Sequence, residues 1–490
     1  MPAVCGRAKR DAGKFVKLIA GAASFGLRIS FLCSWQDRTM THSNLAAWLT
    51  DERLPRYTSY PTAPHFTGAI TSDTYGNWLA GVTPGRRGSL YLHVPFCRSM
   101  CWYCGCHTTI TRLDAPVADY VAVLRREIDL LSGNVVSDLP IHHLHFGGGT
   151  PTVMKPDAFI ALVALLKDRF PFAADAEIAV EIDPRTLAGE MVSALAAAGV
   201  TRASLGVQSL DLEVQRAVNR VQDFECVARA SDSLRSAGIK GLNFDLIYGL
   251  PHESVASCVD TALQCVALRP ERLAVFGYAH VPRFKKHQRK IDEAMLADGS
   301  GRMAQADAIA DVLTQAGYRR IGFDHFALPD DPLSRARTSG RLHRNFQGYT
   351  TDPADVLIGL GASAIGRLPQ GYVQNEVALR GYAARIARGE FATVKGYALT
   401  ADDRLRADVI ERLMCEFRVD LGEVCRRHGR PADFLLSGNR ELLELAASGL
   451  VRIEGTVVAV AEDAPFLVRK TASTFDAYLR GSERSYSRAV

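Results

Sequence analysis

The sequence lacks the features that mark several large classes of protein. Its charges nearly balance, with 58 Lys and Arg against 53 Asp and Glu and a net charge of +5. An excess this small and evenly spread does not indicate a nucleic-acid partner by itself, and it would suit an anionic small substrate equally well. Repeats and low-complexity tracts are absent, and no apolar run after residue 39 is long enough to span a membrane. We therefore expect a soluble, cytoplasmic globular protein with no nucleic-acid or membrane partner.

The cysteine count argues against a disulfide scaffold. The chain has 490 residues and 11 cysteines, an odd number in a chain far longer than small secreted scaffolds. Seven of the cysteines are scattered, and we interpret them as small buried hydrophobic side chains in a reducing compartment. They are Cys5, Cys33, Cys226, Cys258, Cys265, Cys415 and Cys425. The other four lie within ten residues of one another.

The first 39 residues differ from the rest of the chain. They carry five basic residues between Arg7 and Lys17, followed by a short apolar stretch that Arg28 interrupts. A basic start and a short apolar stretch also occur in targeting segments. Because a typical start of a soluble protein follows Met40, we favour residues 1–39 as an extension that plays no part in the fold. A targeting segment is the alternative.

From residue 89 onward, short β-rich runs alternate with helical patterns. The predicted strands are 89–95, 141–146, 177–183, 202–208, 242–249, 272–279 and 318–324. The predicted helices are 117–131, 157–170, 190–199, 211–217, 223–237, 254–267 and 301–317. Alternation at this spacing predicts parallel strands joined by crossover helices. We therefore predict an α/β fold with a full or partial (β/α) barrel over residues 89–367.

Polar or glycine-rich segments follow most of the predicted strands. They are the four-cysteine segment, Gly147–Thr150, Glu181, Gln208, Asp245, and Tyr278 with His280. Catalytic groups of (β/α) barrels lie at the carboxyl ends of the strands, so these residues would share one site. Each could instead be an ordinary loop or helix-cap residue, but that explanation is weaker for all of them together.

A different pattern begins near residue 368. Helices are predicted at 398–417, with a capping box of Thr400 and Asp403, and in LGEVCRRHG (421–429) and NRELLELAASG (439–449). Residues 450–463 are predicted to form a hairpin. Three helices and a hairpin predict a small helical, winged-helix-like domain within 368–490. A DNA-binding regulator is disfavoured because the only local cationic cluster, within 426–430, is explained by a solvated helix end.

The four clustered cysteines, Cys97, Cys101, Cys104 and Cys106, have the spacing C-x3-C-x2-C-x-C. Structural zinc sites usually combine two separated cysteine pairs, and no second pair follows here. A [4Fe–4S] cluster normally takes four cysteines, so three from one tight loop would leave one iron free for another ligand. A zinc knuckle and a redox disulfide pair are the alternatives. Neither explains Gly147–Thr150 or the acidic residues at the strand ends.

With an aromatic residue, Tyr103, before the third cysteine, the motif resembles that of radical S-adenosylmethionine (SAM) enzymes. The resemblance implies a [4Fe–4S] cluster on Cys97, Cys101 and Cys104 whose free iron binds the amino and carboxylate groups of SAM. It also implies that the cluster loop follows the first strand of the barrel, and that Gly147–Thr150 lies along the SAM amino group.

Longer blocks resemble oxygen-independent coproporphyrinogen III oxidases. They include LPRYTSYPTAPHF (54–66), HFGGGTPT (145–152), NFDLIYGLP (243–251) and LHRNFQGYTT (342–351), and the resemblance spans about residues 50–490. It implies oxidative decarboxylation of two propionate side chains of coproporphyrinogen III to vinyl groups, giving protoporphyrinogen IX for haem and porphyrin biosynthesis. A haem chaperone of the same superfamily is the alternative. That branch generally lacks the C-x-C extension and two of the blocks, PRYTSYPT and HRNFQGYTT, which are present here.

The resemblance further implies contacts to two SAM molecules. Tyr91, Gly148 and Glu181 would contact the SAM on the cluster. The residues that would contact either molecule are Tyr103, Gly149, Thr150, Gln208, Arg220, Asp245, Ala279 and Ile365. The carboxylates of Glu181 and Asp245 are hydrogen-bond acceptors suited to the ribose hydroxyls or the methionine ammonium group of SAM. The guanidinium of Arg220 is a donor fork suited to a carboxylate, although a surface ion pair is its alternative.

Two catalytic candidates and a substrate site complete the prediction. We expect Cys106 to matter for activity without binding the cluster, and His93 to be either a site residue or a satisfied core histidine. A substrate with four carboxylates needs cationic and donor side chains over an apolar floor. We assign this role to Arg56, Tyr57, His343, Arg344, Phe346 and Gln347.

The expected partners follow from the same resemblance. No Rossmann fingerprint for NAD or FAD precedes a helix. Reducing equivalents are therefore expected from an electron-donor protein such as a flavodoxin or ferredoxin. We expect a monomer in which residues 40–88 form an N-terminal segment that packs on the site.

Overall fold

The structure is a computed structural model that describes residues 53–135, 138–460, 464 and 466–479. The predicted extension at 1–39 lies outside these residues, and so do Cys5 and Cys33. Of the predicted N-terminal segment 40–88, the structure describes residues 53–88.

Six parallel strands form the centre of the main sheet, side by side in the order of the sequence. They are β1 (Gly88–Val94), β4 (Ile141–Gly148), β5 (Phe172–Ile182), β6 (Arg202–Gln208), β7 (Gly241–Tyr248) and β8 (Arg272–Gly277). On the other side of β1, β13 (Val356–Leu360) adds a further parallel strand. Within the described residues the sheet has twelve strands and ends at β16 and β9, which do not pair with each other. The predicted barrel is therefore a partial one.

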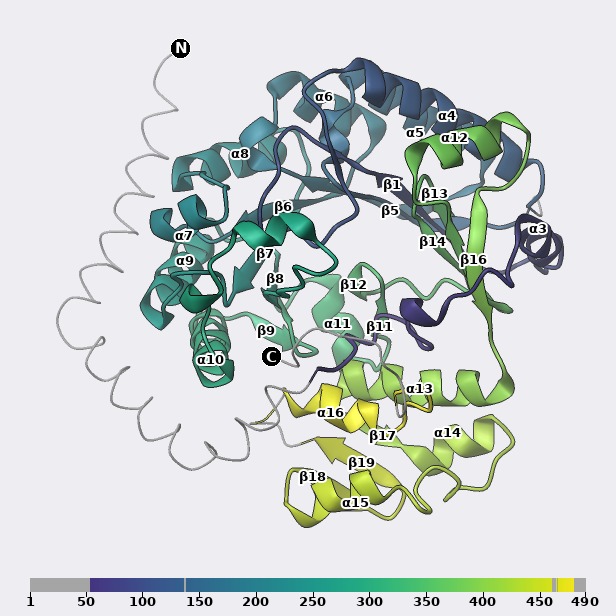
Figure 1. Cartoon of the computed structure of the whole chain (residues 1–490), viewed down its shortest axis with the longest axis vertical. Coiled ribbons are helices and arrows are strands. Elements are labelled where there is room, and N and C mark those ends of the chain that lie inside the picture. Colours follow the sequence, from purple (N-terminus) through teal and green to yellow (C-terminus); the bar gives the residue numbers. More distant parts are fainter. Residues whose placement is uncertain (1–52, 136–137, 461–463, 465, 480–490) are drawn as a thin grey trace.

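Helices cover the outer face of these strands (Figure 1). They are α4 (Ala115–Ser132), α5 (Pro156–Arg169), α6 (Gly189–Ala198), α7 (Leu212–Ala217), α8 (Phe224–Ser236), α9 (Val255–Ala267) and α10 (Gly299–Gln315). Local signals set their ends. A capping box of Ser254 and Ser257 begins α9, and α6 ends at Gly199, whose φ of 83° glycine adopts without steric cost. The alternation of strands and helices predicted from the sequence is confirmed.

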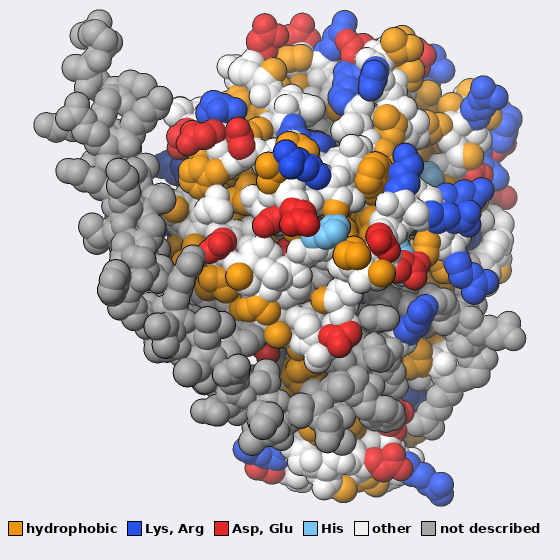
Figure 2. Space-filling view, turned by 60° about the vertical axis from the view of Figure 1, so that its left-hand side comes forward, with side chains coloured by type: hydrophobic (Ala, Val, Ile, Leu, Met, Phe, Trp, Pro, Cys, Tyr) orange, Lys and Arg blue, Asp and Glu red, His pale blue; other side chains and the backbone are white. Residues whose placement is uncertain are grey.

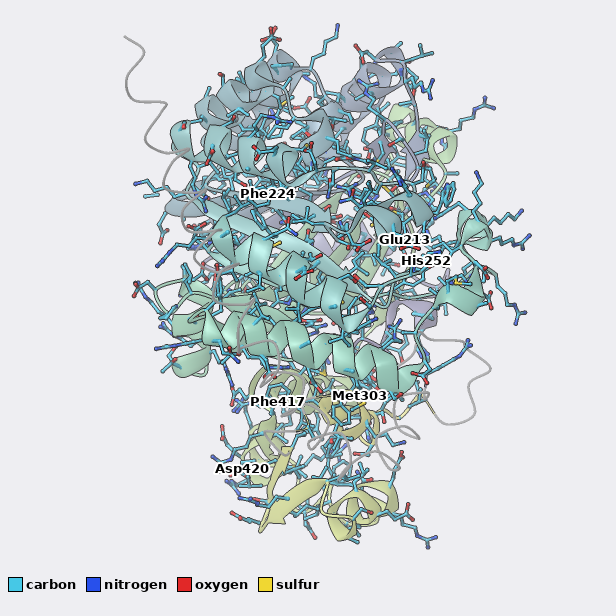
Figure 3. All side chains as sticks on the ribbon, turned by 90° about the vertical axis from the view of Figure 1, so that its left-hand side faces the viewer. Glu213, Phe224, His252, Met303, Phe417 and Asp420 are labelled. Carbon is cyan, nitrogen blue, oxygen red and sulfur yellow. The ribbon has the colours of Figure 1, made fainter. Side chains whose placement is uncertain are left out.

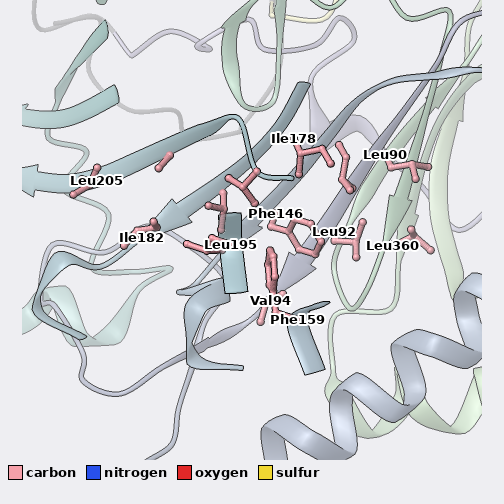
Figure 4. Packing of buried hydrophobic residues seen from close by; sticks show 14 of the residues in the cluster. Leu90, Leu92, Val94, Phe146, Phe159, Ile178, Ile182, Leu195, Leu205 and Leu360 are labelled. Carbon is pink, nitrogen blue, oxygen red and sulfur yellow. The ribbon is translucent and has the colours of Figure 1, made fainter. Parts of the chain in front are cut away.

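The core lies between the strands and these helices (Figure 4). Leu90, Leu92 and Val94 of β1 are each 1% exposed or less. Phe146 of β4 packs against Phe159 of α5, with ring centroids 4.9 Å apart. Burial of a side chain of this size contributes about 1.5–3 kcal/mol. The rigid sheet that results holds the loops at the carboxyl ends of its strands in place.

Both edges of the sheet differ from the prediction. The segment predicted as a last parallel strand forms a hairpin instead, β9 (Arg319–Ile321) with β10 (His325–Ala327), and β10 runs antiparallel to β8. The chain reverses at Gly322, whose φ is 57°. At the other edge, β14 (Ile365–Leu368), β15 (Gly371–Asn375) and β16 (Thr393–Ala398) continue the sheet antiparallel, with α12 (Leu379–Ala387) before β16. The boundary predicted at residue 367 thus falls inside β14.

Short elements complete this part of the chain. The 3-10 helices are η2 (Ala63–His65), η3 (Pro151–Val153), η4 (Pro184–Thr186), η5 (Lys286–Lys290) and η6 (Glu293–Met295). Two helices are α3 (Ser72–Ala80) and α11 (Pro332–Thr338), and the two-stranded pairs are β2 (Phe96–Cys97) with β3 (Thr109–Ile110) and β11 (His343–Asn345) with β12 (Gly348–Thr350). The pair β2–β3 brackets the cysteine segment.

The C-terminal residues form a unit below the barrel, which includes Phe417 and Asp420 (Figures 1 and 3). In order it contains α13 (Ala401–Glu416), β17 (Arg418–Asp420), α14 (Leu421–Arg427), α15 (Arg440–Ala447), β18 (Val451–Glu454), β19 (Val457–Val460) and α16 (Leu467–Ser473). The capping box of Thr400 and Asp403 is present, and β17, β19 and β18 form an antiparallel sheet. This order is compatible with the predicted winged-helix-like domain.

The surface carries charges of both signs. On the face shown in Figure 2, Lys and Arg side chains lie among Asp and Glu side chains, as the small net charge predicts. Among the described residues, no helix has the length and apolar character needed to cross a membrane.

Candidate active site

One cavity of about 410 Å³ lies where the parallel strands end. Every strand from β1 to β8 contributes to its lining, either directly or through the loop that follows it. Residues from the cysteine loop are joined there by Gly148–Thr150 after β4, Glu181 and Asp183 at the end of β5, Gln208 after β6, and Asp245 of β7. The polar segments that the sequence placed at separate strand ends therefore share one site. A volume of this size is in the range of small-molecule sites, about 300–1,000 Å³.

All four cysteines of the loop line this cavity. Cys97, Cys101 and Cys104 all line it, and so does Cys106, which is the exposed member of the four. The backbone holds the loop in place, because Trp102 donates a hydrogen bond to the Val218 carbonyl at 2.9 Å. Among the described residues no three His, Cys, Asp or Glu side chains converge as a single metal ion requires. A four-iron cluster, whose cysteine ligands each bind a different iron, does not require such convergence.

The thiols differ in their electrostatic surroundings. A hydrogen bond from Cys106 outweighs burial and lowers the pKa of Cys104 to about 6, with smaller help from His287 and Lys285. Burial raises the pKa of Cys97 to about 12, although its thiol lies 3.3 Å from the Thr150 hydroxyl. A metal ion or cluster that binds Cys97 would have to displace its proton.

Two arginines approach the thiol of Cys101, the second cysteine of the loop. Arg220 Nη1 lies 3.4 Å from the Cys101 sulfur and Arg185 Nη2 lies 3.6 Å from it. Both guanidinium groups are held by Asp183, which pairs with Arg185 at 2.6 Å and with Arg220 at 3.3 Å. Burial alone would raise the pKa of Asp183, but the hydrogen bond from Arg185 and the two positive charges lower it. This arrangement places two guanidinium groups within hydrogen-bonding distance of the Cys101 sulfur.

The glycine segment after β4 is packed tightly against the first strand. A Cβ on Gly149 would lie 2.5 Å from the Phe96 carbonyl oxygen, and one on Gly148 would lie 2.6 Å from the ring of His93. The φ of Gly148 is 112°, which L-residues rarely adopt. Only glycine therefore lets this backbone pass between β1 and the cavity. The sequence predicted a close approach to a ligand, and the structure adds that the segment closes on β1 as well.

Two further acidic residues of the cavity, Glu181 and Asp245, accept hydrogen bonds from backbone, His, Ser and Asn donors. Glu181 accepts hydrogen bonds from the Gly148 backbone N–H at 3.1 Å and from His145 at 3.2 Å. Asp245 accepts from Ser204 and from Asn243, each at 2.8 Å. Burial raises the pKa of Asp245 to about 6, although both of these hydrogen bonds favour the carboxylate. The two groups can accept hydrogen bonds from a ligand in the cavity.

The orientation of Arg220 is set by several contacts. Its Nη2 donates to the Gly206 carbonyl at 2.6 Å, and Gly206 has no side chain that would displace it. The Nε of Arg220 is buried without a hydrogen-bond partner. The Arg220 side chain also lines the cavity, so its guanidinium is placed where a ligand acceptor could meet it. The alternative of a surface ion pair is wrong, because Arg220 is 6% exposed.

Three predicted residues do not line the cavity. Tyr91 lies behind it and donates to His93 Nδ1 at 3.0 Å. His93 uses its other ring nitrogen, Nε2, to donate to the His107 carbonyl at 3.1 Å, and burial lowers its pKa, so it is a neutral histidine with both nitrogens engaged. The structure favours the satisfied core histidine over a catalytic one. Ile365 begins β14 and packs over Gly359.

The predicted substrate residues also divide into those that line the cavity and those that do not. Arg56 lines the cavity and donates to the Gly277 carbonyl at 2.8 Å. The other five do not line it. Tyr57 binds Asp476 at 3.1 Å, and His343 pairs with Glu411 at 3.1 Å, both at the C-terminal unit. Arg344 is buried over the ring of Tyr349, at 4.4 Å from its centroid.

The last two of these residues lie beside Arg344 in the chain. Phe346 packs edge-on against Tyr372, with centroids 6.2 Å apart, and the backbone N–H of Gln347 donates to the Asn345 side chain at 2.9 Å. The buried block LHRNFQGYTT (342–351) thus packs against the C-terminal unit and does not form the cavity wall. The pattern of cationic and aromatic residues could not distinguish these two roles.

Sequence reasoning missed a group of side chains that hold the cysteine loop from outside. Lys285, His287 and Gln288 donate to the carbonyls of Cys106, Cys104 and Tyr103 at 2.9, 2.7 and 2.9 Å. The only signal in the sequence was the basic run KKHQRK (285–290), which by itself suggests a solvated surface. Asp183 and Arg185 were missed as well, although they lie only two and four residues after Glu181.

Comparisons with known proteins identify the family. The profile of the radical SAM superfamily matches residues 91–265. An oxygen-independent coproporphyrinogen III oxidase from Bradyrhizobium diazoefficiens is 56% identical to this chain over 448 residues, which cover 91% of this chain and 100% of the relative. The chain belongs to the oxygen-independent coproporphyrinogen III oxidase family. The oxidase of that name from Paracoccus denitrificans is 44% identical and covers 88% of this chain.

A solved structure of the family has the same fold. Coproporphyrinogen III oxidase from Escherichia coli, described as a radical SAM enzyme, superposes with a TM-score of 0.83 at 38% identity, covering 87% of this chain and 100% of that one. The radical SAM family implies a [4Fe–4S] cluster and SAM. The site fits both groups: four cysteines line one cavity, three of them with the spacing of cluster ligands, glycines leave room along its wall, and Arg220 and two carboxylates border it.

Proposed function

We propose that this chain catalyses the oxygen-independent conversion of coproporphyrinogen III to protoporphyrinogen IX. Each of two propionate side chains loses a β-hydrogen atom, one carbon dioxide and one electron, which passes to an external one-electron acceptor, and becomes a vinyl group. One observation carries the proposal: Cys97, Cys101 and Cys104 meet Gly149 and Arg220 at a single cavity. The chain also covers the full length of a relative named as this oxidase.

The three cysteines would hold the cluster, with SAM beside it. When bound, these groups supply the one-electron cleavage of SAM and the hydrogen abstraction that starts decarboxylation. Arg185 and Arg220 stabilise negative charge on the Cys101 sulfur through charge-assisted hydrogen bonds. Thr150 donates toward the Cys97 sulfur. The cavity walls keep water away from the reacting carbon.

The polar residues of the cavity would orient SAM. Glu181 and Asp245 would accept hydrogen bonds from its ammonium or ribose hydroxyl groups, and Arg220 would direct its guanidinium toward the carboxylate. Tyr103, Gln208 and Ala279 line the side of the cavity formed with β6 and β8. We assign that side to a second SAM molecule. Equilibrium binding of radiolabelled SAM to the reconstituted protein should then give two sites per cluster.

Arg56 is the proposed contact for a substrate carboxylate. It is a cationic side chain that both lines the cavity and belongs to the N-terminal segment. Arg344 acts on Arg56 rather than on the substrate, because its Nη2 donates to the Arg56 carbonyl at 3.4 Å. An electron-donor protein such as a flavodoxin or ferredoxin would supply electrons to a monomeric enzyme.

The test is an anaerobic assay of the full chain after cluster reconstitution. With coproporphyrinogen III, SAM and dithionite it should release two molecules of carbon dioxide per protoporphyrinogen IX formed. Stoichiometric haem binding without SAM-dependent product would instead establish the chaperone.

A variant at Cys106 tests the ligand assignment. Cys106→Ser should keep full iron content, because three other thiols hold the cluster, but should lower turnover. Loss of the cluster would show that Cys106 is a ligand, and turnover equal to that of the unmodified chain would remove it from the active site.

A further inference from the structure

The segment that follows β8 concentrates positive charge. Residues 282–290 contain five Lys and Arg and no acidic residue, in a chain whose total net charge is only +5. Four of the five basic side chains are exposed: Arg283, Lys286, Arg289 and Lys290. Asp292 and Glu293 follow the run, but Asp292 caps η6 and Glu293 pairs with His280 at 2.9 Å. The run therefore presents a cationic face to solvent.

The inner side of the same segment is bound to the cysteine loop. Lys285, His287 and Gln288 donate to three backbone carbonyls of that loop. The carbonyl that His287 binds, at 2.7 Å, is that of Cys104 itself. Lys290 lies over the ring of Trp102, 5.3 Å from its centroid. Gln288 is fully buried. A single layer of chain thus separates the exposed cations from a proposed cluster ligand.

The outer side has the features of an unoccupied interface. Among the described residues, none of Arg283, Lys286 and Arg289 forms an ion pair, whereas other surface arginines do, such as Arg86 with Asp355 at 3.1 Å and Arg427 with Glu423 at 2.6 Å. Phe284 lies within the run and is 68% exposed. Arginine and aromatic side chains are enriched at protein interfaces.

We propose that the outer face of residues 282–290, the basic rim, is the docking surface for a small acidic protein that carries one electron at a time. The inference rests on the proposed function, since that reaction requires electrons to reach the cluster from a partner. An acidic partner is complementary to the rim, and charge steering raises its rate of encounter. Docking there places the carrier next to the backbone of Cys104, so the electron has a short path to the cluster.

The test measures reduction of the reconstituted cluster, which needs no substrate turnover. Reduced flavodoxin is mixed anaerobically with the full chain, and the loss of cluster absorbance is followed by stopped flow at low and high salt. We expect R283E/K286E/R289E to slow reduction at low salt by about tenfold or more, because three charges that steer the carrier are reversed. R283Q/K286Q/R289Q should give a smaller loss. High salt should slow reduction of the cluster in the unmodified protein and make its rate more similar to those of the rim variants.

Two controls keep the result specific. R125E/R126E/K240E reverses three exposed cations on α4 and before β7, and it should not change the rate. Reduction by dithionite should be equal in all four proteins, with equal iron content. The proposal is overturned if flavodoxin reduces the rim variants as fast as the unmodified chain, or if dithionite is slowed equally. If no protoporphyrinogen forms while the charge dependence persists, the proposed function fails and the docking surface stands.

Discussion

Both ends of the barrel bury charged side chains, but the two ends use them differently. Where the strands begin, Arg202 and Arg272 both bind Asp331, at 3.5 and 2.7 Å, and Arg202 also pairs with Glu177 at 3.1 Å. Where the strands end, Asp245 borders the cavity and is held only by the neutral donors Ser204 and Asn243.

The pKa values express this contrast. Burial would raise the pKa of Glu177, but the charges of Arg202 and Arg272 outweigh it and lower the pKa to about 2. At Asp245 no nearby cation compensates to that extent, and burial raises the pKa to about 6. The charged groups at the beginning of the strands therefore pair with one another, although Arg202 Nη1 and Arg272 Nη2 are buried without hydrogen-bond partners, whereas Asp245 at the other end has no ion-pair partner and borders the cavity. Stability should depend on the first group and activity on the second.

The largest effect is expected at the cavity end. Cys101→Ala should abolish the cluster and all turnover, because the thiol is a proposed iron ligand. It should leave the fold intact, because Cys101 belongs to none of the hydrophobic core clusters among the described residues. Iron analysis and absorbance after anaerobic reconstitution measure this. Cys226→Ala, on α8, is the matched control and should retain full iron. Normal iron content in Cys101→Ala would make the ligand assignment wrong.

At the opposite end, Asp331→Ala should lower the free energy of unfolding by about 3–5 kcal/mol, because it leaves two buried arginines without their shared partner. It also removes the N-cap of α11. Urea denaturation measures the change, and Asp330→Ala, which removes an exposed neighbour, is the control. The folded fraction should keep its turnover. A variant with normal stability and lost activity would reverse the proposed division between the two ends.

A smaller effect is expected from Arg220→Ala, which should weaken SAM binding about ten- to a hundred-fold. The loss corresponds to one charge-assisted hydrogen bond, about 1.5–3 kcal/mol. Iron content should be retained, because Arg185 still approaches Cys101. Equilibrium dialysis against SAM gives the affinity, and Arg216→Ala, an exposed residue on α7, should match the unmodified chain. Unchanged affinity in Arg220→Ala would remove this residue from the SAM site.

The smallest effect concerns pH. The pKa of Asp245 is raised to about 6, so the carboxylate that would accept from SAM is present above that pH and is lost below it. SAM affinity should fall by at most about tenfold per pH unit as the pH drops from 6 toward 5. The free energy of unfolding of the ligand-free protein depends on pH in the opposite direction, because burial favours the neutral carboxyl of Asp245. This contribution to stability declines as the pH rises from about 4 to 6.

Asp245→Asn isolates the titration of this one group. The variant should bind SAM weakly at every pH and lose the dependence near pH 6 when titration calorimetry is run from pH 5 to 8. A pH profile identical to that of the unmodified chain would assign the titration to another residue.

Much of the cavity end could be predicted from the sequence. Strand ends, glycine spacing and the cysteine motif placed Gly148, Glu181, Gln208 and Asp245 in one site because parallel strands carry their carboxyl ends to the same edge. The block around Arg344 was predicted less well. Cationic and aromatic residues suit an anionic ligand and a buried interface equally, and only packing against the C-terminal unit distinguishes the two.

The sequence by itself determined the central strands with their crossover helices, the parallel order of those strands, and the cysteine loop at their carboxyl ends. These depend on hydrophobic periodicity, caps and spacings that act over a few residues of chain. Only the tertiary structure decided that His287 holds Cys104, 183 residues away along the chain, and that Asp183 orients Arg220. It also decided that the chain turns back after β9 and leaves the barrel open. Such contacts join residues far apart in sequence, so no local pattern encodes them.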